Sequence, residues 1–157
     1  MKKIISIFAL ICMVFTLGSC GSKGVDFNSL KENMMSADDS LPSMKTVSDK
    51  SENAETLFKS LSDFDYSGIE SFFLAYASDG SPYEIAAVKL KDAGDLEKLE
   101  TTLNNHIGDR VRLYKNYAPG YAKKAEKAIV ISKDNIAALI MSDKSDEVKK
   151  AFEKSFK

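Results

Sequence analysis

Residues 69–90 read IESFFLAYASDGSPYEIAAVKL, and this stretch gives the clearest indication of the fold. Two apolar runs of strand length, 69–77 and 83–90, flank the segment Ser78-Asp79-Gly80-Ser81-Pro82. An Asp-Gly pair favours the positive φ angles of a tight turn, and a proline suits the entrance of a strand. The stretch therefore predicts an antiparallel β-hairpin.

A second hairpin and a long helix follow. The runs 128–132 and 136–141 are separated by Lys133-Asp134-Asn135, and both are apolar at successive positions, as in strands that are covered on both faces or lie centrally in a sheet. Between the hairpins, apolar residues recur every three or four positions. This spacing predicts a helix that begins at Asp92 or Asp95 and ends at Pro119-Gly120, with Gly108 as a point where it kinks or ends early. Its apolar stripe comprises Leu96, Leu99, Leu103, Ile107, Val111, Tyr114 and Tyr117.

Shorter helices are predicted on both sides of this core. Asp26 can cap a first helix, a second follows near residues 54–61, and a last helix begins near residues 143–147. Residues 26–50 fit either a helix of the domain or a flexible linker, because 37–50 are rich in serine and charge. The order ααββαββα predicts one α+β domain over 26–157, with a mostly antiparallel four-stranded sheet made of two hairpins and a long crossing helix.

The N-terminus has the features of a lipoprotein signal peptide. A basic start, Met1-Lys2-Lys3, precedes an apolar run that closes in Leu17-Gly18-Ser19-Cys20. This pattern predicts cleavage between Ser19 and Cys20, so that residues 1–19 are removed and 20–25 form a lipidated tether. A plain secretory signal with an incidental cysteine is the alternative. A membrane-spanning helix needs about 20 apolar residues, more than this run provides.

Processing changes the charge and the thiol content. Removal of Lys2 and Lys3 from the 22 Lys and Arg residues leaves 20, against 23 Asp and Glu, a formal charge of −3 that argues against nucleic-acid binding. The two cysteines are Cys12, in the signal peptide, and Cys20, whose thiol would carry diacylglycerol. The mature domain is thus expected to have no disulfide, thiolate metal site or cysteine nucleophile. We expect a lipid anchor in the cell membrane, on its extracytoplasmic face.

Few residues suggest catalysis, and the sequence predicts no metal site and no cofactor. His106 is the only histidine, beside the apolar stripe of the long helix, where a structural role competes with that of a base. The acidic residues Asp38, Asp39, Asp63 and Asp65 lie among turn and cap residues. Glu84 opens an apolar strand, where it faces solvent, pairs with a lysine or, least expected, takes part in catalysis.

A basic segment is the main surface candidate. It contains Arg110, Arg112, Lys115, Lys123, Lys124 and Lys127, interleaved with Tyr114, Tyr117 and Tyr121. Arg112, Lys115, Lys123 and Lys124 are the residues expected to contact anionic headgroups or an anionic wall polymer. An ordinary solvated helix face is the alternative.

With these elements in place, the chain resembles a family of small lipoproteins of Gram-positive, clostridia-like bacteria whose domain is described only as domain of unknown function 4358. The resemblance rests on Cys20, a helix over 28–35 before Leu41-Pro42, the strand 84–91, and a long helix closing in Tyr117-Ala118-Pro119, with the hairpin 128–141 and a terminal helix. It implies that the 28–35 helix belongs to the domain, and it implies no activity. Glu84 and Tyr117 are polar positions of functional interest within it, together with Pro119.

Three functions remain open on these grounds. The first is an anchored, non-enzymatic module that binds an envelope protein or an anionic polymer. The second is capture of a small ligand for a transporter or sensor, which requires an apolar pocket with convergent polar groups. The third is an envelope enzyme that uses Glu84, Asp63 or Asp65 as carboxylate catalysts.

Overall fold

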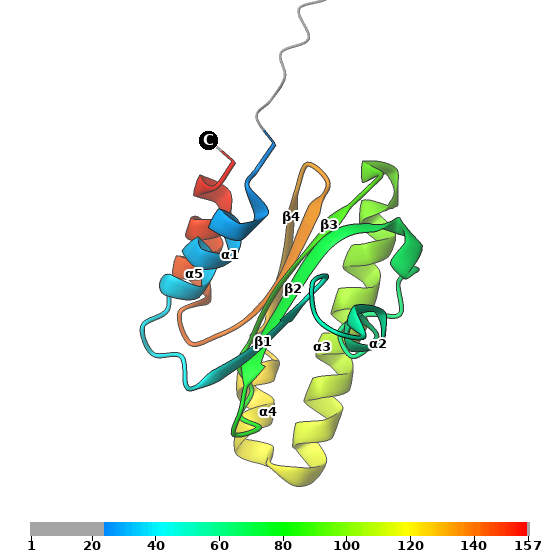
Figure 1. Cartoon of the computed structure of the whole chain (residues 1–157). Helices are drawn as coiled ribbons and strands as arrows, with labels where there is room; N and C mark the ends of the chain where they lie inside the picture. The colour runs from blue at the N-terminus through cyan, green and yellow to red at the C-terminus, as the bar shows by residue number, and fades with distance from the viewer. Residues whose placement is uncertain (1–23, 157) are drawn as a thin grey trace, which may run out of the picture.

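The computed structural model describes residues 24–156 and has an α+β fold built on one antiparallel sheet (Figure 1). The sheet contains five strands in the order β1-β2-β3-β5-β4, and each neighbouring pair is antiparallel. The strands are β1 (Met44–Ser48), β2 (Ile69–Ala77), β3 (Glu84–Leu90), β4 (Ile129–Lys133) and β5 (Ile136–Met141).

Both predicted hairpins are confirmed. β2 and β3 pair from Tyr76 opposite Glu84 to Ile69 opposite Leu90, and Gly80 takes a φ of +77° in the turn between them. The Asp79 carboxylate fixes this turn by accepting hydrogen bonds from the backbone N–H and the hydroxyl of Ser81, at 2.9 and 2.6 Å. β4 and β5 are joined through Asp134, whose φ of 56° also lies in the left-handed region.

Helices cover both faces of the sheet. α1 (Phe27–Ser36) and α5 (Ser145–Lys154) lie on one face, and α2 (Ala54–Phe58), α3 (Leu96–Tyr117) and α4 (Pro119–Ala125) lie on the other (Figure 1). Short 3₁₀ turns, η1 (Tyr66–Gly68) and η2 (Ala93–Asp95), precede β2 and α3. Asp26 caps α1 as predicted, since its carboxylate accepts from the Asn28 N–H and the Ser29 hydroxyl.

The central strands are apolar at successive positions because each face of the sheet has its own core. On β3, Ala86 and Val88 pack toward α3, whereas Ile85 and Ala87 pack toward α1 and α5. The α3 core also contains Phe58, Phe72, Leu99, Leu103 and Leu139. The opposite core contains Leu30, Phe73, Ile140, Val148 and Phe152. Burial on both faces was one of the two settings predicted for the second hairpin, and it is found for β5 but not for β4, which is partly buried at the edge of the sheet.

The prediction of four strands was wrong, because β1 adds a fifth. β1 comes from the serine-rich segment that fitted a linker, and it pairs with β2 from Met44 opposite Ala77 to Ser48 opposite Phe73. It is an edge strand, and only Val47 packs against the α3 core, while Lys45 and Thr46 are exposed. An edge strand gains its order from backbone pairing, so it leaves little apolar pattern in the sequence.

The long helix differs from its prediction in three details. α3 begins after Asp95, one of the two predicted starts, but it continues without interruption through Gly108, where a kink or an early end was predicted. It ends at Tyr117, and Pro119 then begins a separate helix, α4, that was not predicted. Proline is well suited to the first turn of a helix, where its missing N–H has no intrahelical partner. Tyr117 is 82% exposed, so it does not belong to the apolar stripe.

The predicted cleavage and lipidation residues, Ser19 and Cys20, lie outside the described residues. Within residues 24–156, no helix combines the length and the apolar character needed to span a membrane.

Candidate functional site

Glu84 is buried at the start of β3, with 3% of its surface exposed. Neither the solvent-facing position nor the lysine partner expected from the sequence is found. The His106 Nε2 lies 2.6 Å from one carboxylate oxygen of Glu84, and the Arg110 Nε lies 2.6 Å from the other. Burial of a carboxylate is costly unless partners compensate its charge, and here α3 supplies both partners.

The helical repeat explains why α3 supplies them. His106, Arg110 and Tyr114 are spaced by four residues, so they lie in one row along the helix. This row faces the start of β3 and the turn that precedes it. The Tyr114 hydroxyl accepts a hydrogen bond from the Arg110 Nη2 at 2.9 Å and donates one to the Gly80 carbonyl at 3.2 Å. The row thereby connects α3 to the β2–β3 hairpin.

Arg110 is held by this row without being fully hydrogen-bonded. Its guanidinium lies 5.1 Å from the ring centre of Tyr114, a cation–π distance. Its buried Nε is at ion-pair distance from Glu84, but the N–H is not directed well enough at the oxygen to count as a hydrogen bond. Burial raises the pKa of the Tyr114 hydroxyl, and Arg110 opposes that shift. Tyr114 is therefore neutral at physiological pH.

A cavity of about 340 Å³ opens beside these charged residues. Its volume falls in the lower part of the range typical of small-molecule sites, about 300–1,000 Å³. Strands β1 and β2, helix α2 and the row on α3 surround it. It is lined by Val47, Leu57, Ser60, Leu74, Tyr76, Glu84, His106 and Arg110. The cavity is thus largely apolar, with charged groups gathered on the side of β3 and α3.

A second hollow of about 200 Å³ adjoins this cavity and shares Ser60 and His106 with it. Its lining is polar and includes two of the chain's exposed carboxylates, Asp63 and Asp109. Asp65 does not take part, because its carboxylate accepts from the Ser67 N–H and caps η1. Of the carboxylates predicted for catalysis, Glu84 lines the cavity, Asp63 lines the adjoining hollow, and Asp65 lines neither.

His106 contacts a carboxylate, and the structure shows no hydroxyl nucleophile bonded to it within residues 24–156. A hydroxyl nucleophile must lie within hydrogen-bond reach of its base. The Ser60 hydroxyl donates to the Leu57 carbonyl and not to His106. No group of three His, Cys, Asp or Glu side chains within those residues is placed to hold a metal ion.

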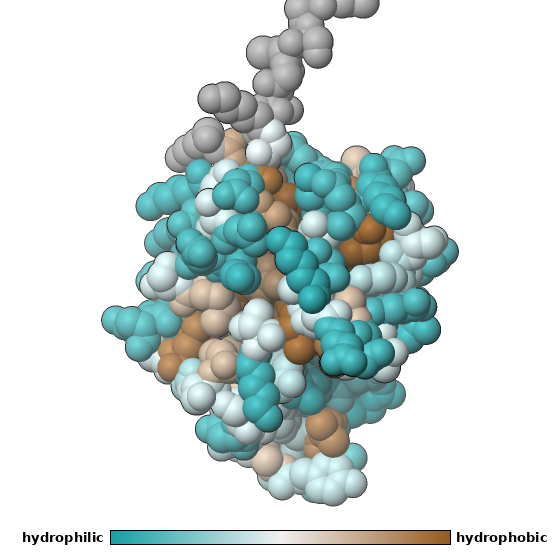
Figure 2. Space-filling model, viewed as in Figure 1, coloured by the Kyte–Doolittle hydropathy of each residue, from teal (hydrophilic) through white to brown (hydrophobic). Residues whose placement is uncertain are grey.

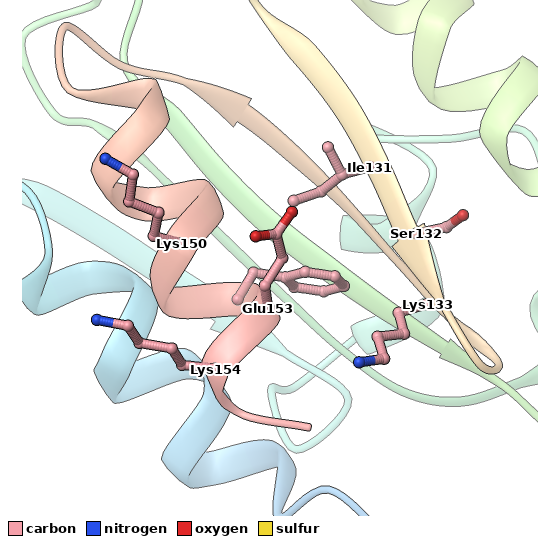
Figure 3. A pocket seen from close by; sticks show the side chains of 7 residues that line it. Ile131, Ser132, Lys133, Lys150, Glu153 and Lys154 are labelled. Carbon is pink, nitrogen blue, oxygen red and sulfur yellow. The ribbon is translucent and has the colours of Figure 1, made fainter. Parts of the chain in front are cut away.

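The hollow between β4 and α5 is larger, about 450 Å³, but it has a different character (Figure 3). It is lined by Ile131, Ser132, Lys133, Lys150, Phe152, Glu153 and Lys154. In Figure 3, Lys150 and Lys154 extend away from β4, and Glu153 points toward Ile131. Its charged groups are surface side chains that do not converge on one point, so we do not regard it as the candidate site.

The basic residues predicted to contact an anionic surface are largely paired with acids. Arg112 contacts Asp109, Lys115 lies 2.8 Å from Glu126, and Lys124 lies 2.8 Å from Asp143. Lys123, also on α4, is exposed. These pairs reduce the positive potential that a contact with headgroups or a wall polymer requires.

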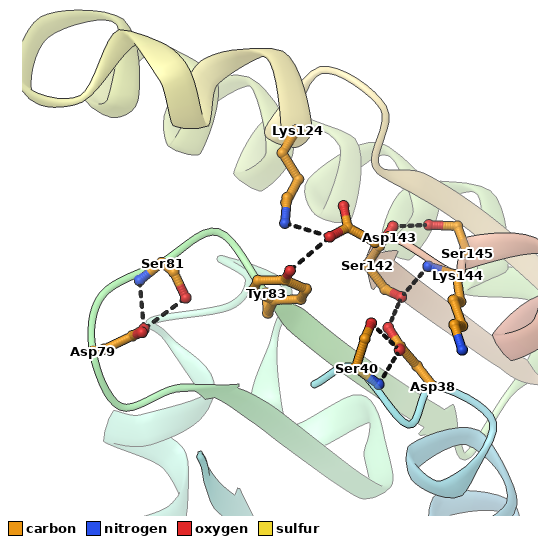
Figure 4. A network of polar contacts seen from close by, with 10 residues as sticks. All are labelled: Asp38, Ser40, Asp79, Ser81, Tyr83, Lys124, Ser142, Asp143, Lys144 and Ser145. Carbon is orange, nitrogen blue, oxygen red and sulfur yellow. Dashed lines mark hydrogen bonds and ion pairs between the residues drawn. The ribbon is translucent and has the colours of Figure 1, made fainter. Parts of the chain in front are cut away.

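Lys124 belongs to a polar network that joins α4 to β3 (Figure 4). Its Nζ lies 3.7 Å from the ring centre of Tyr83, whose hydroxyl donates to Asp143 at 2.7 Å. Burial alone would lower the pKa of Lys124, but hydrogen bonds to Asp143 and Tyr83 raise it overall. Hydrogen bonds from Lys124 and Tyr83 lower the pKa of Asp143. Lys124 is therefore fixed to the domain and is not free to sample a surface.

The tip where α3 meets α4 carries the exposed apolar side chains. Leu113 and Tyr121 are each 43% exposed, and Tyr117 is 82% exposed. Hydrophobic surface is visible near the lower end of the molecule in Figure 2, the end at which α3 meets α4 in Figure 1. Helix α1 lies toward the opposite, upper end (Figure 1). Tyr117 and Glu84, both polar positions of interest in the sequence, are thus separate features of the structure.

The fold and the cavity define a small domain with helices on both faces of an antiparallel sheet and a charged cluster beside an apolar hollow. The chain belongs to the family described as Domain of unknown function (DUF4358), whose profile matches residues 43–142. The matched segment contains all five strands, α3 and the Glu84 cluster, whereas α1 and α5 lie outside it. No curated protein and no solved structure matches the chain.

Sequence reasoning identified Glu84 but missed its relation to His106 and Arg110. His106 was expected to be structural and Arg110 was grouped with the surface cations. The signal that links them is the spacing of four residues on the long helix, together with a glutamate in an apolar strand. The sequence does not show which strand residue the helix faces, because Glu84 and His106 are 22 positions apart.

Proposed function

We propose that this protein is a lipid-anchored, extracytoplasmic and non-enzymatic binding protein whose cavity beside Glu84 holds a small ligand. One observation carries the proposal: a charged cluster with buried atoms borders a cavity whose other walls are largely apolar. Pockets of this composition are the usual sites for small molecules. Among the functions left open by the sequence, the cavity favours capture of a small ligand.

The anchor is supported by the sequence alone, through Leu17-Gly18-Ser19-Cys20. Two acyl chains on one cysteine give stable membrane attachment, which one chain does not. Cys20→Ala should release the protein from the membrane fraction of producing cells and abolish labelling by radioactive palmitate. A Cys20→Ala protein that stays in the membrane fraction would show that another segment holds it there.

Binding in the cavity can be tested at Ser60, which lines the cavity of about 340 Å³. The Ser60 hydroxyl donates to the Leu57 carbonyl, so it bonds within α2 and its C-terminal turn. Ser60→Phe fills the cavity without removing a charge, and Ser60→Ala is the matched control. Small anionic, neutral and cationic compounds are screened, and at least one of them should shift NMR signals of Val47, Leu57 and Leu74 in the wild type and in Ser60→Ala. Ser60→Phe should lose these shifts, and equal shifts in both variants would contradict the proposal.

A carboxylate enzyme is the runner-up, and a substitution of Glu84 tests it. In the structure both oxygens of Glu84 contact α3, at 2.6 Å, so neither is left free to act on a substrate. Catalysis by Glu84 requires its ionisation to change during the reaction. If Glu84→Gln complements a deletion strain as fully as the wild type, that role is excluded.

A second candidate function is contact with an envelope protein through the tip of α3 and α4. It is favoured by the three exposed apolar side chains there, Leu113, Tyr117 and Tyr121. Tyrosine is enriched at protein interfaces and is often among the few residues that contribute most of the binding energy. Tyr117→Ala should remove any crosslinked partner of the anchored protein in intact cells. Lys123→Ala on α4 is the control, and an unchanged crosslink in Tyr117→Ala would contradict this candidate.

A further inference from the structure

The three charged side chains at the cavity differ in what they offer to a ligand. The exposed fraction is 4% for the Glu84 side chain, 13% for His106 and 27% for Arg110. The carboxylate therefore lies behind the two nitrogen-bearing side chains. A ligand that enters the cavity meets the Arg110 side chain before it meets a carboxylate oxygen of Glu84.

Arg110 has donors that the protein does not use. A guanidinium carries five N–H groups in a planar fork. The Arg110 Nε faces Glu84, and one N–H of Nη2 is bonded to the Tyr114 hydroxyl. The other N–H groups, on Nη1 and Nη2, have no partner among residues 24–156. Adjacent N–H groups of Nη1 and Nη2 form the arrangement that matches the two oxygens of a carboxylate.

The contacts to Glu84 and Tyr114 also hold the guanidinium in place. A free arginine loses side-chain entropy when it binds, and a pre-positioned one loses less. The charge of Glu84 offsets that of Arg110, but the carboxylate is the more deeply buried of the two. The nearer positive charge then dominates the interaction with an anion in the cavity. Glu84 thus serves as a positioning residue for Arg110.

The other residues of the cavity limit the size and the polarity of the remainder of the ligand. Val47, Leu57 and Leu74 supply apolar side chains, and Tyr76 adds an aromatic ring. The volume of about 340 Å³ suits a short chain or one ring. We infer, on the basis of the proposed function, that the ligand is a small organic carboxylate with an apolar body, whose carboxylate is bound by the unused N–H groups of Arg110.

Three compounds of equal length test this ligand class: hexanoate, hexanamide and hexylammonium. Each is titrated into the processed protein, held in phosphatidylcholine nanodiscs, with empty nanodiscs as the blank and NMR shifts as the readout. Hexanoate should shift signals of Val47, Leu57 and Leu74, with hexanamide at least about tenfold weaker, since charge-assisted hydrogen bonds are about twice as strong as neutral ones. Hexylammonium should leave these signals unchanged.

Variants of Arg110 complete the test. Arg110→Gln should weaken hexanoate binding about tenfold or more, since it removes charge-assisted hydrogen bonds to the ligand's carboxylate. Arg110→Lys keeps the charge beside Glu84 without the fork, so it should weaken binding less, and it remains informative if Arg110→Gln does not fold. Arg112→Gln is the control, because Arg112 lies on the same helix with a side chain 77% exposed.

The outcomes separate the ligand class from the proposed function. If hexanamide or hexylammonium shifts the cavity signals at the same or lower concentration than hexanoate, the carboxylate inference is overturned and binding in the cavity stands. Hexanoate binding that is unchanged by Arg110→Gln and Arg110→Lys also overturns it. If no compound shifts the cavity signals at about 10 mM, far above a dissociation constant of 1 mM, both the inference and the cavity as the ligand site fail.

Discussion

Asp38 and Glu84 are two acidic residues with the same 3% exposure, but the regions around them differ. Asp38 follows α1 and accepts hydrogen bonds from the Ser40 N–H at 2.8 Å, and from the hydroxyls of Ser40 and Ser142, both at 2.5 Å (Figure 4). These donors are short and uncharged. Glu84 contacts the side chains of Arg110 and His106 from α3, beside a cavity.

Unused hydrogen-bond donors distinguish the carboxylate beside the cavity from the one with a structural role. Short donors close to the backbone satisfy Asp38 and tie the segment after α1 to the end of β5, with no spare donor directed outward. The Glu84 cluster leaves Arg110 with unused N–H groups at the cavity. A cluster with spare donors beside a hollow can accept a ligand, whereas a satisfied one contributes to stability.

The largest expected effect is on stability, from Glu84→Ala. It leaves the buried part of Arg110 without its counter-charge, and loss of one partner of a buried pair costs about 3 kcal/mol or more. The free energy of unfolding is measured by urea denaturation. Glu70→Ala is the control, because the Glu70–Lys89 pair is more exposed and such pairs contribute about 1 kcal/mol or less. Equal losses for the two variants would remove the distinction drawn for Glu84.

Asp38→Asn should cost about 2 kcal/mol at pH 7, because it removes the charge from several hydrogen bonds. Burial alone would raise the pKa of Asp38, but hydrogen bonds from Ser142 and Ser40 lower it overall. The stabilisation is therefore present above the unfolded-state pKa of about 3.9 and is lost as the pH falls through the lower folded-state value.

The stability difference between wild type and Asp38→Asn should therefore shrink as the pH falls below about 4, as measured by unfolding at several pH values. Asp38→Asn should also leave the affinity for hexanoate unchanged, since Asp38 does not line the cavity. A large loss of hexanoate binding would show that Asp38 supports the binding site as Glu84 does, and it would contradict the distinction between the two residues.

The smallest effect is expected from Asp143→Asn, which weakens the partly exposed pair with Lys124. The Asp143 side chain is 54% exposed, so the free energy of unfolding should fall by about 0.5 kcal/mol. The shift in melting temperature on Asp143→Asn, compared with that of Asp109→Asn in the exposed Arg112 pair, measures it. A loss as large as that of Asp38→Asn would show that the α4 network is a main support of the fold.

Much of the fold was predictable because its signals are local. The Asp79-Gly80 turn, the apolar runs of β3 and β5, the Asp26 cap and the stripe on α3 each depend on residues close in sequence. β1 was missed because edge pairing leaves little apolar pattern, and α4 because Pro119 signals the end of one helix and the beginning of another equally well.

The candidate site was only partly predictable for a related reason. Glu84 was recognisable as an acid in an apolar strand. Its partners depend on which residues of α3 face the start of β3, and this is a property of packing. The apolar stripe indicates which side of a helix is buried, but it does not show which strand residue lies opposite. With about 3.6 residues per turn, His106 lies at the margin of that stripe. Arg110 lies within it, between Leu99 and Leu103 around the helix axis, but the spacing does not show what a charged side chain there contacts.

The most direct test of the cavity as a binding site is the dissociation constant of hexanoate for Ser60→Ala and Ser60→Phe, measured side by side by NMR titration. Both variants keep Glu84, His106 and Arg110, and they differ in the space left in the cavity. We expect Ser60→Ala to bind like the wild type and Ser60→Phe to bind at least about tenfold more weakly, a difference of about 1.4 kcal/mol. Equal dissociation constants for the two variants would contradict the account.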